Sequence, residues 1–89
     1  MAAALTLLAA GCSNPPATVI DGSSPAAFDS TVTMARGDLG NADRLIFDRA
    51  IHGVGGRRFG ERDTQALART TFDGMTAAEV VADQRARDR

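Results

Sequence analysis

Hydrophobic residues follow two different patterns along this chain. Residues 2–10 read A-A-A-L-T-L-L-A-A and carry no charge. Further along, apolar residues recur at intervals of four, three and four positions, at Phe28, Val32, Ala35 and Leu39. This spacing places their side chains on one face of a helix. The pattern therefore predicts a short apolar leader followed by amphipathic helices.

The first predicted helix has a well-marked start. In the stretch D-G-S-S-P-A-A-F, Ser24 suits the N-cap and Pro25 suits the first helical position. Gly37 and Gly40 bracket the end of the helix. Residues 30–33 read S-T-V-T, and because these are weak helix formers, a short strand is the alternative there.

A second helix is predicted to begin near Asn41 as N-cap and to end at Gly53. Its inward stripe is assigned to Leu45, Ile46 and Ala50, with Ile51 at the margin. The residues expected to face water are all charged: Asp43, Arg44, Asp48 and Arg49.

The next ten residues, Gly53–Arg62, contain four glycines and are predicted to form a loop. The glycines do not indicate a phosphate-binding loop, because no strand precedes them and no G-K-[ST] follows. Arg57 and Arg58 offer two cations for an anion, but a solvated pair is the favoured interpretation. Phe59 is expected to hold the loop against the core.

Two further helices complete the predicted fold. The third runs from Asp63 or Thr64 to Phe72, with an apolar face of Leu67, Ala68, Thr71 and Phe72, and D-G at 73–74 then turns the chain. In the fourth, Thr76 and Glu79 fit a capping box, and Met75 and Val80 have the spacing of a hydrophobic staple. Val80 and Val81 should face the core, and the polar end at 85–89 is expected to fray.

Composition limits the chain to one small domain. It has 89 residues, and its core must be built without Trp or Tyr and with four Phe, so we expect modest stability. The net charge is -1, and all ten basic residues are Arg. This balance gives no field that would attract nucleic acid. The fold class is therefore predicted as all-α, a small bundle of three to four short helices.

The single cysteine, Cys12, follows the apolar leader in L-L-A-A-G-C-S. The leader is shorter than the roughly 20 residues that span a bilayer, and it has the length of a secretory signal core. These residues resemble the signal and lipobox of bacterial lipoproteins. The resemblance implies cleavage between Gly11 and Cys12, and a covalent lipid, with acyl groups such as palmitate, on Cys12. The lipid would anchor the chain to a membrane.

Two features depart from the lipoprotein pattern. Ala9 stands at the usual aliphatic position, with Leu8 one step earlier, and no positive charge other than the amino terminus precedes the apolar run. We therefore expect the true start to lie upstream of Met1. The alternative is a buried helix that begins a cytosolic domain. Ser13 would be the second mature residue, and the resemblance implies that serine there permits sorting to the outer membrane of a Gram-negative cell, facing the periplasm.

The predicted organisation is a signal peptide at 1–11, a lipidated tether at 12–19, a helical domain at 20–84 and a frayed tail at 85–89. Two prolines favour an extended tether, and the stretch from Ser13 to Ser24 could reach about 35–40 Å. Two blocks, I-D-G-S-S-P-A-A-F and F-D-G-M-T-A-A-E-V-V, resemble the ends of a family of small bacterial lipoproteins of unknown function. That resemblance implies an all-α fold and supplies no activity.

No catalytic set stands out in the sequence. His52 is the only histidine and suits a helix end, Ser23 and Ser24 suit a turn and a cap, and no metal set or cofactor motif is present. Three carboxylates could pair only if the fold brings two of them together: Asp21, Asp29 and Asp73. We therefore expect neither an enzyme nor a small-molecule substrate.

Two functional hypotheses remain. The first is a lipid-anchored lipoprotein of the cell envelope, whose helical domain binds an envelope protein through an exposed apolar patch or serves a structural role. The second is a soluble cytosolic helical binding module with an uncleaved N-terminal helix. Its nucleic-acid version would use Arg57, Arg58 and Arg62, and the near-zero net charge weighs against it.

Overall fold

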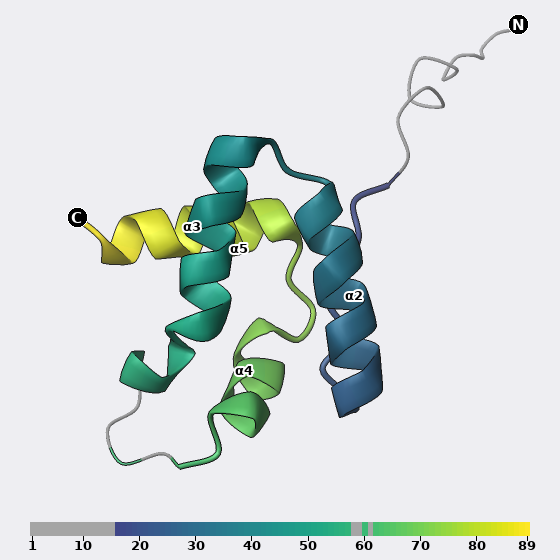
Figure 1. The fold of residues 1–89 in the computed structure, drawn as a ribbon, viewed down its shortest axis with the longest axis vertical. Helices are drawn as coiled ribbons and strands as arrows, with labels where there is room; N and C mark the ends of the chain where they lie inside the picture. Colours follow the sequence, from purple (N-terminus) through teal and green to yellow (C-terminus); the bar gives the residue numbers. More distant parts are fainter. Residues whose placement is uncertain (1–15, 58–59, 61) are drawn as a thin grey trace, which may run out of the picture.

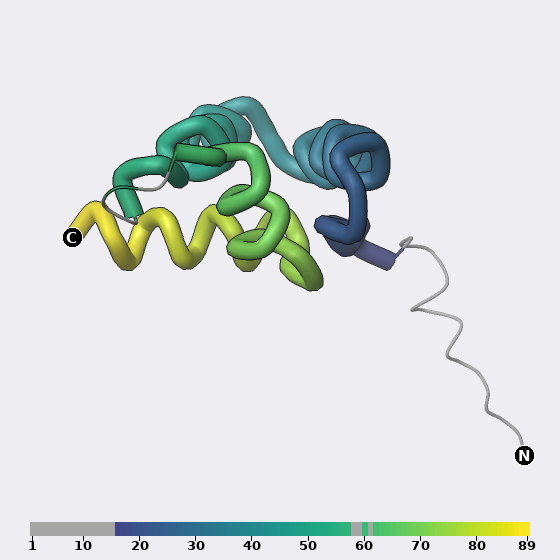
Figure 2. Tube along the Cα trace, turned by 90° about the horizontal axis from the view of Figure 1, so that it is seen from below, coloured from purple at the N-terminus to yellow at the C-terminus, as the bar shows by residue number. Residues whose placement is uncertain are grey.

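The computed structural model describes residues 16–57, 60 and 62–89, and within them the chain is all-α, as predicted (Figure 1). Four α-helices and one 3₁₀ turn follow one another in the order α2 (Pro25–Gly37), α3 (Asn41–His52), η2 (Val54–Arg57), α4 (Thr64–Phe72) and α5 (Ala77–Arg87). Helix α3 packs across α5, and Figure 2 shows α2 and α3 in one layer with α5 beneath them. The fully buried large side chains are Phe47, Phe72, Ile20, Val54 and Val80.

Helix α2 begins where the local sequence indicates. The Ser24 hydroxyl accepts a hydrogen bond from the Ala27 amide at 3.1 Å, and Pro25 occupies the first turn. Phe28 and Ala35 are buried, and Val32 and Leu39 pack against the core. Residues 30–33 are helical, so the strand alternative is wrong. The Thr31 hydroxyl donates to the Ala27 carbonyl at 2.7 Å, which keeps this hydroxyl satisfied within the helix.

The inward face of α3 differs from the predicted stripe. Leu45 is 70% exposed, whereas Phe47 is 1% exposed and lies in the core with Ala50. Three consecutive apolar residues, Leu45 to Phe47, fit more than one helical register, and packing against α5 selects the register that buries the aromatic ring. The N-cap is Gly40, without a side-chain hydrogen bond, and Asn41 is the first helical residue. Gly53 ends the helix, as predicted.

Part of the glycine-rich stretch is ordered, contrary to the prediction of a simple loop. Val54–Arg57 form a 3₁₀ turn that packs against α4, and Val54 is 1% exposed. Gly55 lies so close to α4 that an added Cβ would be 2.9 Å from the Thr64 side chain. The expectations for Arg58 and Phe59 fall outside the described residues.

Arg57 is not the solvated side chain that the sequence suggested. Its guanidinium lies over the Phe72 ring, 5.1 Å from the centroid, and forms an ion pair with Asp83 at 3.2 Å. It also donates to the Gln84 side-chain oxygen at 3.1 Å. Burial lowers the pKa of Arg57, the positive charge of Arg87 adds to this, and Asp83 opposes both. Arg57 therefore joins η2 to α4 and α5, and it is not available to an anion.

Helix α4 keeps its predicted bounds, and α5 begins with the predicted capping box. The Asp63 side chain accepts from the Ala66 amide at 2.9 Å, and Ala68 and Phe72 are buried. The capping box of α5 is confirmed, since the Thr76 amide donates to Glu79 at 2.9 Å and the Glu79 amide donates to the Thr76 hydroxyl at 3.3 Å.

Helix α5 extends to Arg87, into the stretch 85–89 that the sequence predicts to fray. Its last turns are linked to α3, because Arg85 forms an ion pair with Asp43 at 2.7 Å and Asp88 forms one with Arg49. The predicted frayed tail therefore consists of helix with partners on the neighbouring element, and the reason is that α5 runs beneath α3.

The segment ahead of α2 belongs to the folded domain from Thr18 onward. Val19 forms an isolated antiparallel bridge with Thr76, and Ile20 is buried. The Ile20 amide donates to the Met75 carbonyl at 2.9 Å, and the Gly74 amide donates to the Ile20 carbonyl at 2.8 Å. The two sequence blocks at 20–28 and 72–81 therefore lie against each other. Because residues 18–22 are bonded to the domain, a tether ahead of them ends at residue 17 and not at 19.

Candidate functional site

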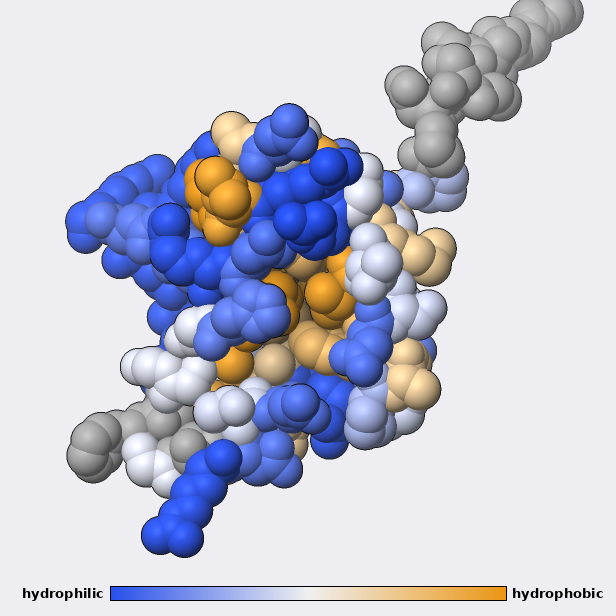
Figure 3. Space-filling model, viewed as in Figure 1, coloured by the Kyte–Doolittle hydropathy of each residue, from blue (hydrophilic) through white to orange (hydrophobic). Residues whose placement is uncertain are grey.

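A groove of about 850 Å³ lies between α2, α3 and α4. Figure 3 shows it as a hollow with hydrophobic side chains inside and hydrophilic ones around it. The apolar residues that line it come from every element that surrounds it: Phe28, Val32, Ile51, Val54 and Ala68. A volume in this range with a mainly apolar floor is typical of small-molecule binding sites.

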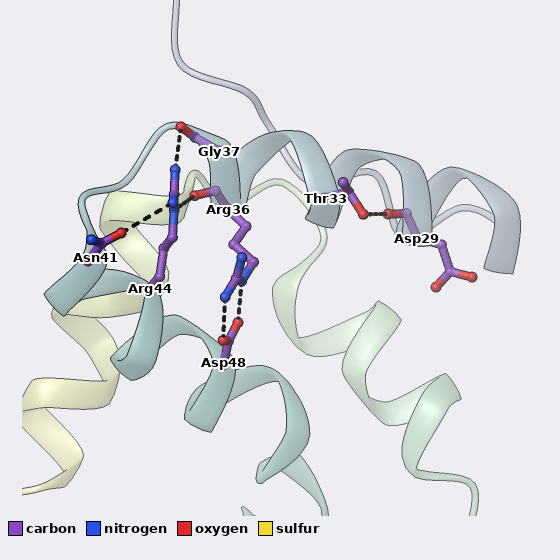
Figure 4. A network of polar contacts seen from close by, with 7 residues as sticks. All are labelled: Asp29, Thr33, Arg36, Gly37, Asn41, Arg44 and Asp48. Atoms are coloured by element: carbon purple, nitrogen blue, oxygen red, sulfur yellow. Dashed lines mark hydrogen bonds and ion pairs between the residues drawn. The ribbon is translucent and has the colours of Figure 1, made fainter.

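One ion pair crosses the groove at the end nearest the α2–α3 connection. Arg36 of α2 donates two hydrogen bonds to the Asp48 carboxylate of α3, at 2.8 and 2.9 Å (Figure 4). These hydrogen bonds lower the pKa of Asp48 and raise that of Arg36, and the charges of His52 and Arg44 lower the pKa of Asp48 further. A bidentate pair fixes the orientation of both side chains, so it sets the separation of α2 and α3.

Arg44, on α3, caps the C-terminus of α2. The Arg44 guanidinium donates to the carbonyl of Arg36 at 3.1 Å and to that of Gly37 at 3.4 Å (Figure 4). These carbonyls lie in the last turn of α2, where the regular helical hydrogen bonds end, and that of Arg36 also accepts from the Leu39 amide at 3.2 Å. Arg44 also donates to the Asn41 side-chain oxygen at 3.4 Å. Its hydrogen bonds are therefore used within the protein.

The remaining charged groups of the groove have no such partners. Arg69, on α4, is a partly buried residue whose guanidinium makes no hydrogen bond or ion pair within the described part of the chain. The Asp29 carboxylate, on α2, is likewise without a partner there, and it is exposed. His52, the last residue of α3, is exposed at the edge of the groove. Among the described residues, the side of the groove formed by α2 and α4 thus carries one guanidinium and one carboxylate, neither of which has a partner there.

The carboxylates considered from the sequence have structural contacts. The Asp73 side chain accepts from the Gly22 amide at 2.7 Å, and that of Asp21 accepts from the Ser23 amide at 2.9 Å. The hydrogen bonds from Ser23 lower the pKa of Asp21. Asp29 lies apart from both, on α2 and in the groove. Among the residues described, no group of three or more His, Cys, Asp or Glu could hold a metal ion.

The predicted lipidation site, Cys12, lies outside the described residues, and so do its neighbours Gly11 and Ser13. Over the ranges that the structure covers, none of the helices has the length and apolar character needed to cross a membrane.

Sequence reasoning did not find the groove. It assigned Asp48 to the solvent-facing side of its helix and gave no role to Arg36 or Arg69. Arg36 and Asp48 are twelve positions apart on different helices, so no local spacing links them. The one sequence feature that could have indicated the groove was the occurrence of arginines beside the apolar stripes of three predicted helices.

Comparisons with known proteins give no relative from which a function could be transferred. No family model matches the chain, and neither the curated proteins nor the solved structures contain a significant match.

Proposed function

We propose that this chain is a lipid-anchored protein of the bacterial cell envelope, attached through Cys12, whose helical domain presents the groove as a binding surface. The observation that carries the anchor is the sequence L-A-A-G-C, a lipobox-like stretch that places the single cysteine directly after an uncharged apolar run. Two or three acyl chains on that residue would hold stably, since each buried methylene contributes about 0.8 kcal/mol.

The arrangement of the domain is compatible with such an anchor. The groove opens on the face seen in Figures 1 and 3, whereas residues 16–18 leave on the opposite side, next to α5 (Figure 2). From Cys12 to Thr18, the first residue bonded to the domain, the chain can extend by at most about 20 Å. An anchored domain would therefore stay near the membrane, with its groove on the side of the domain away from the attachment point.

The test compares three chains expressed in a bacterium from the natural gene with its upstream DNA: wild type, Cys12→Ser and the double variant Cys12→Ser/Ala17→Cys. The double variant restores a thiol five residues later, at an exposed position of the described structure. It is the matched control, because it shows whether the position of the cysteine in the sequence is required and not only its presence.

We expect only the wild type to lack residues 1–11, to carry acyl mass and to stay with the membrane fraction. Both variants should be unacylated and soluble. A wild-type protein that begins at Met1 or upstream of it, without acyl mass, would contradict the proposal, and a soluble one would favour the cytosolic binding module. Circular dichroism of the purified Cys12→Ser chain verifies that the domain is folded.

A further inference from the structure

The groove is lined by more positive than negative charge, although the whole chain is slightly acidic. The charged groups that line it among the described residues are three guanidinium groups, of Arg36, Arg44 and Arg69, and two carboxylates, of Asp29 and Asp48, which gives +1 with His52 neutral. The chain as a whole carries -1. The groove is thus a local site of positive charge above an apolar floor.

Only one of these cations is available to a ligand. Arg36 is engaged by Asp48 through two hydrogen bonds, and Arg44 by the carbonyls at the end of α2. Arg69 has no such partner in the described chain and is partly buried beside Ala68 of the floor. An anion beside this guanidinium would form a charge-assisted hydrogen bond with it.

The lining of the groove suits an amphiphilic occupant. Apolar side chains lie together in it with one guanidinium that has no partner in the described part of the chain. An alkyl chain can lie against the apolar residues and leave its head group at the rim.

We infer that the groove binds a single-chain anionic amphiphile, with its alkyl chain on Phe28, Val32 and Ile51 and its carboxylate or phosphate on Arg69. This inference rests on the proposed function in taking the groove as the binding surface, but it does not depend on the anchor. Exposed Asp29 lies on the same rim and would disfavour the anionic head group, so the two unpartnered charges should have opposite effects on affinity.

The test uses the full chain carrying Cys12→Ser, which cannot be acylated there, and probes held below their micelle concentrations. The probes are decanoate and decyl phosphate, with decylamine as the cationic counterpart and decanol as the uncharged one. Binding is followed by amide chemical shifts in two-dimensional NMR and by calorimetry. A failure here leaves the anchoring experiment unaffected, because that experiment measures acyl mass and fractionation.

Two pairs of variants separate the head group from the chain. Arg69→Gln should weaken decanoate binding about tenfold. Arg62→Gln should leave it unchanged, because Arg62 is exposed, lies outside the groove and has no partner in the part of the chain that the structure describes. Asp29→Asn should strengthen binding about twofold. Val32→Asp should abolish binding, and Met34→Asp, on the exposed side of the same helix, should preserve it. Thermal unfolding of each variant verifies that it is folded.

The proposal is supported if decanoate and decyl phosphate bind one to one, shift the groove amides and respond to Arg69→Gln. It is overturned if neither binds, if decylamine binds equally well, or if Arg69→Gln and Arg62→Gln behave alike. It is also overturned if the amphiphiles leave the groove amides unshifted and an acidic amphipathic peptide shifts them. That result would assign the surface to a protein partner.

Discussion

Gly22 lies where the N-terminal segment passes closest to α4. A Cβ at this position would lie 2.1 Å from the carbonyl oxygen of Arg69 and 3.0 Å from the Cβ of Asp73. Its amide donates to the Asp73 carboxylate at 2.7 Å, so the contact is both close and directional. The absence of a side chain at Gly22 therefore lets residues 18–22 lie directly against the end of α4.

We predict that Gly22→Ala lowers the free energy of unfolding by about 2–3 kcal/mol, because a backbone carbonyl cannot move aside as a flexible side chain can. The matched control is Gly37→Ala, at the end of α2, where an added Cβ meets nothing within 4 Å. That change should raise the stability by about 0.5 kcal/mol through helix propensity. Denaturant unfolding followed by circular dichroism measures both, and equal stabilities would show that the close approach is not required.

At the scale of elements, α2 and α3 are held at a fixed separation by polar contacts at one end of the groove. The Arg36–Asp48 pair and the hydrogen bonds of Arg44 join the two helices, and both sets lie near the connection at 38–40. Both members of the ion pair are more than a third exposed, so it orients the helices more than it stabilises them.

This arrangement predicts an acid sensitivity of the α2–α3 contact. The pKa of Asp48 is below its ordinary value of 3.8 in the folded protein, so the pair contributes stability above that value. The contribution is lost as the pH falls through the lower folded-state pKa, because a protonated Asp48 no longer accepts from Arg36 as a charged group.

The measurement is the free energy of unfolding from pH 5 down to the acid transition, for wild type and Asp48→Asn. The variant should be less stable at pH 5, and the difference should shrink as the pH falls below the ordinary value of 3.8. Asp29→Asn, whose carboxylate has no partner in the described chain, is the control and should follow the wild-type curve. A constant difference for Asp48→Asn at every pH would contradict the assignment.

At the scale of the whole molecule, the N-terminal segment is an integral part of the domain. Ile20 is 1% exposed and lies in one core with Phe72 and Val80. In a domain of this size, one buried aliphatic side chain is a sizeable fraction of the apolar contact. If the chain is anchored through Cys12, the segment that follows the anchor therefore leads directly to a core residue, Ile20.

We predict that Ile20→Ala lowers the free energy of unfolding by about 2–4 kcal/mol, because it removes a fully buried side chain and leaves a cavity. Val19→Ala, at the neighbouring position that is 53% exposed, should change it by less than about 0.5 kcal/mol. Thermal unfolding compares the two. A chain that begins at Thr18 should fold like the full chain and one that begins at Ser23 should not, and a folded chain from Ser23 would show that the segment is dispensable.

The sequence by itself determined the helices and most of their ends. Ser24, Asp63 and the Thr76–Glu79 box each bond to an amide within three residues, so a short stretch contains all the atoms of the cap. The stripe through Phe28 and Ala35 was readable for a similar reason, since helical periodicity alone puts these residues on one face.

Tertiary structure decided the features whose partners are far apart in the chain. The choice of Phe47 over Leu45 depends on α5, the burial of Arg57 depends on Phe72 and Asp83, and the bonding of Ile20 depends on Gly74 and Met75. The groove lies between three helices, and the Arg36–Asp48 pair that spans it joins residues of two of them. Local spacing contains no information on such contacts, because their geometry is set only when the helices pack.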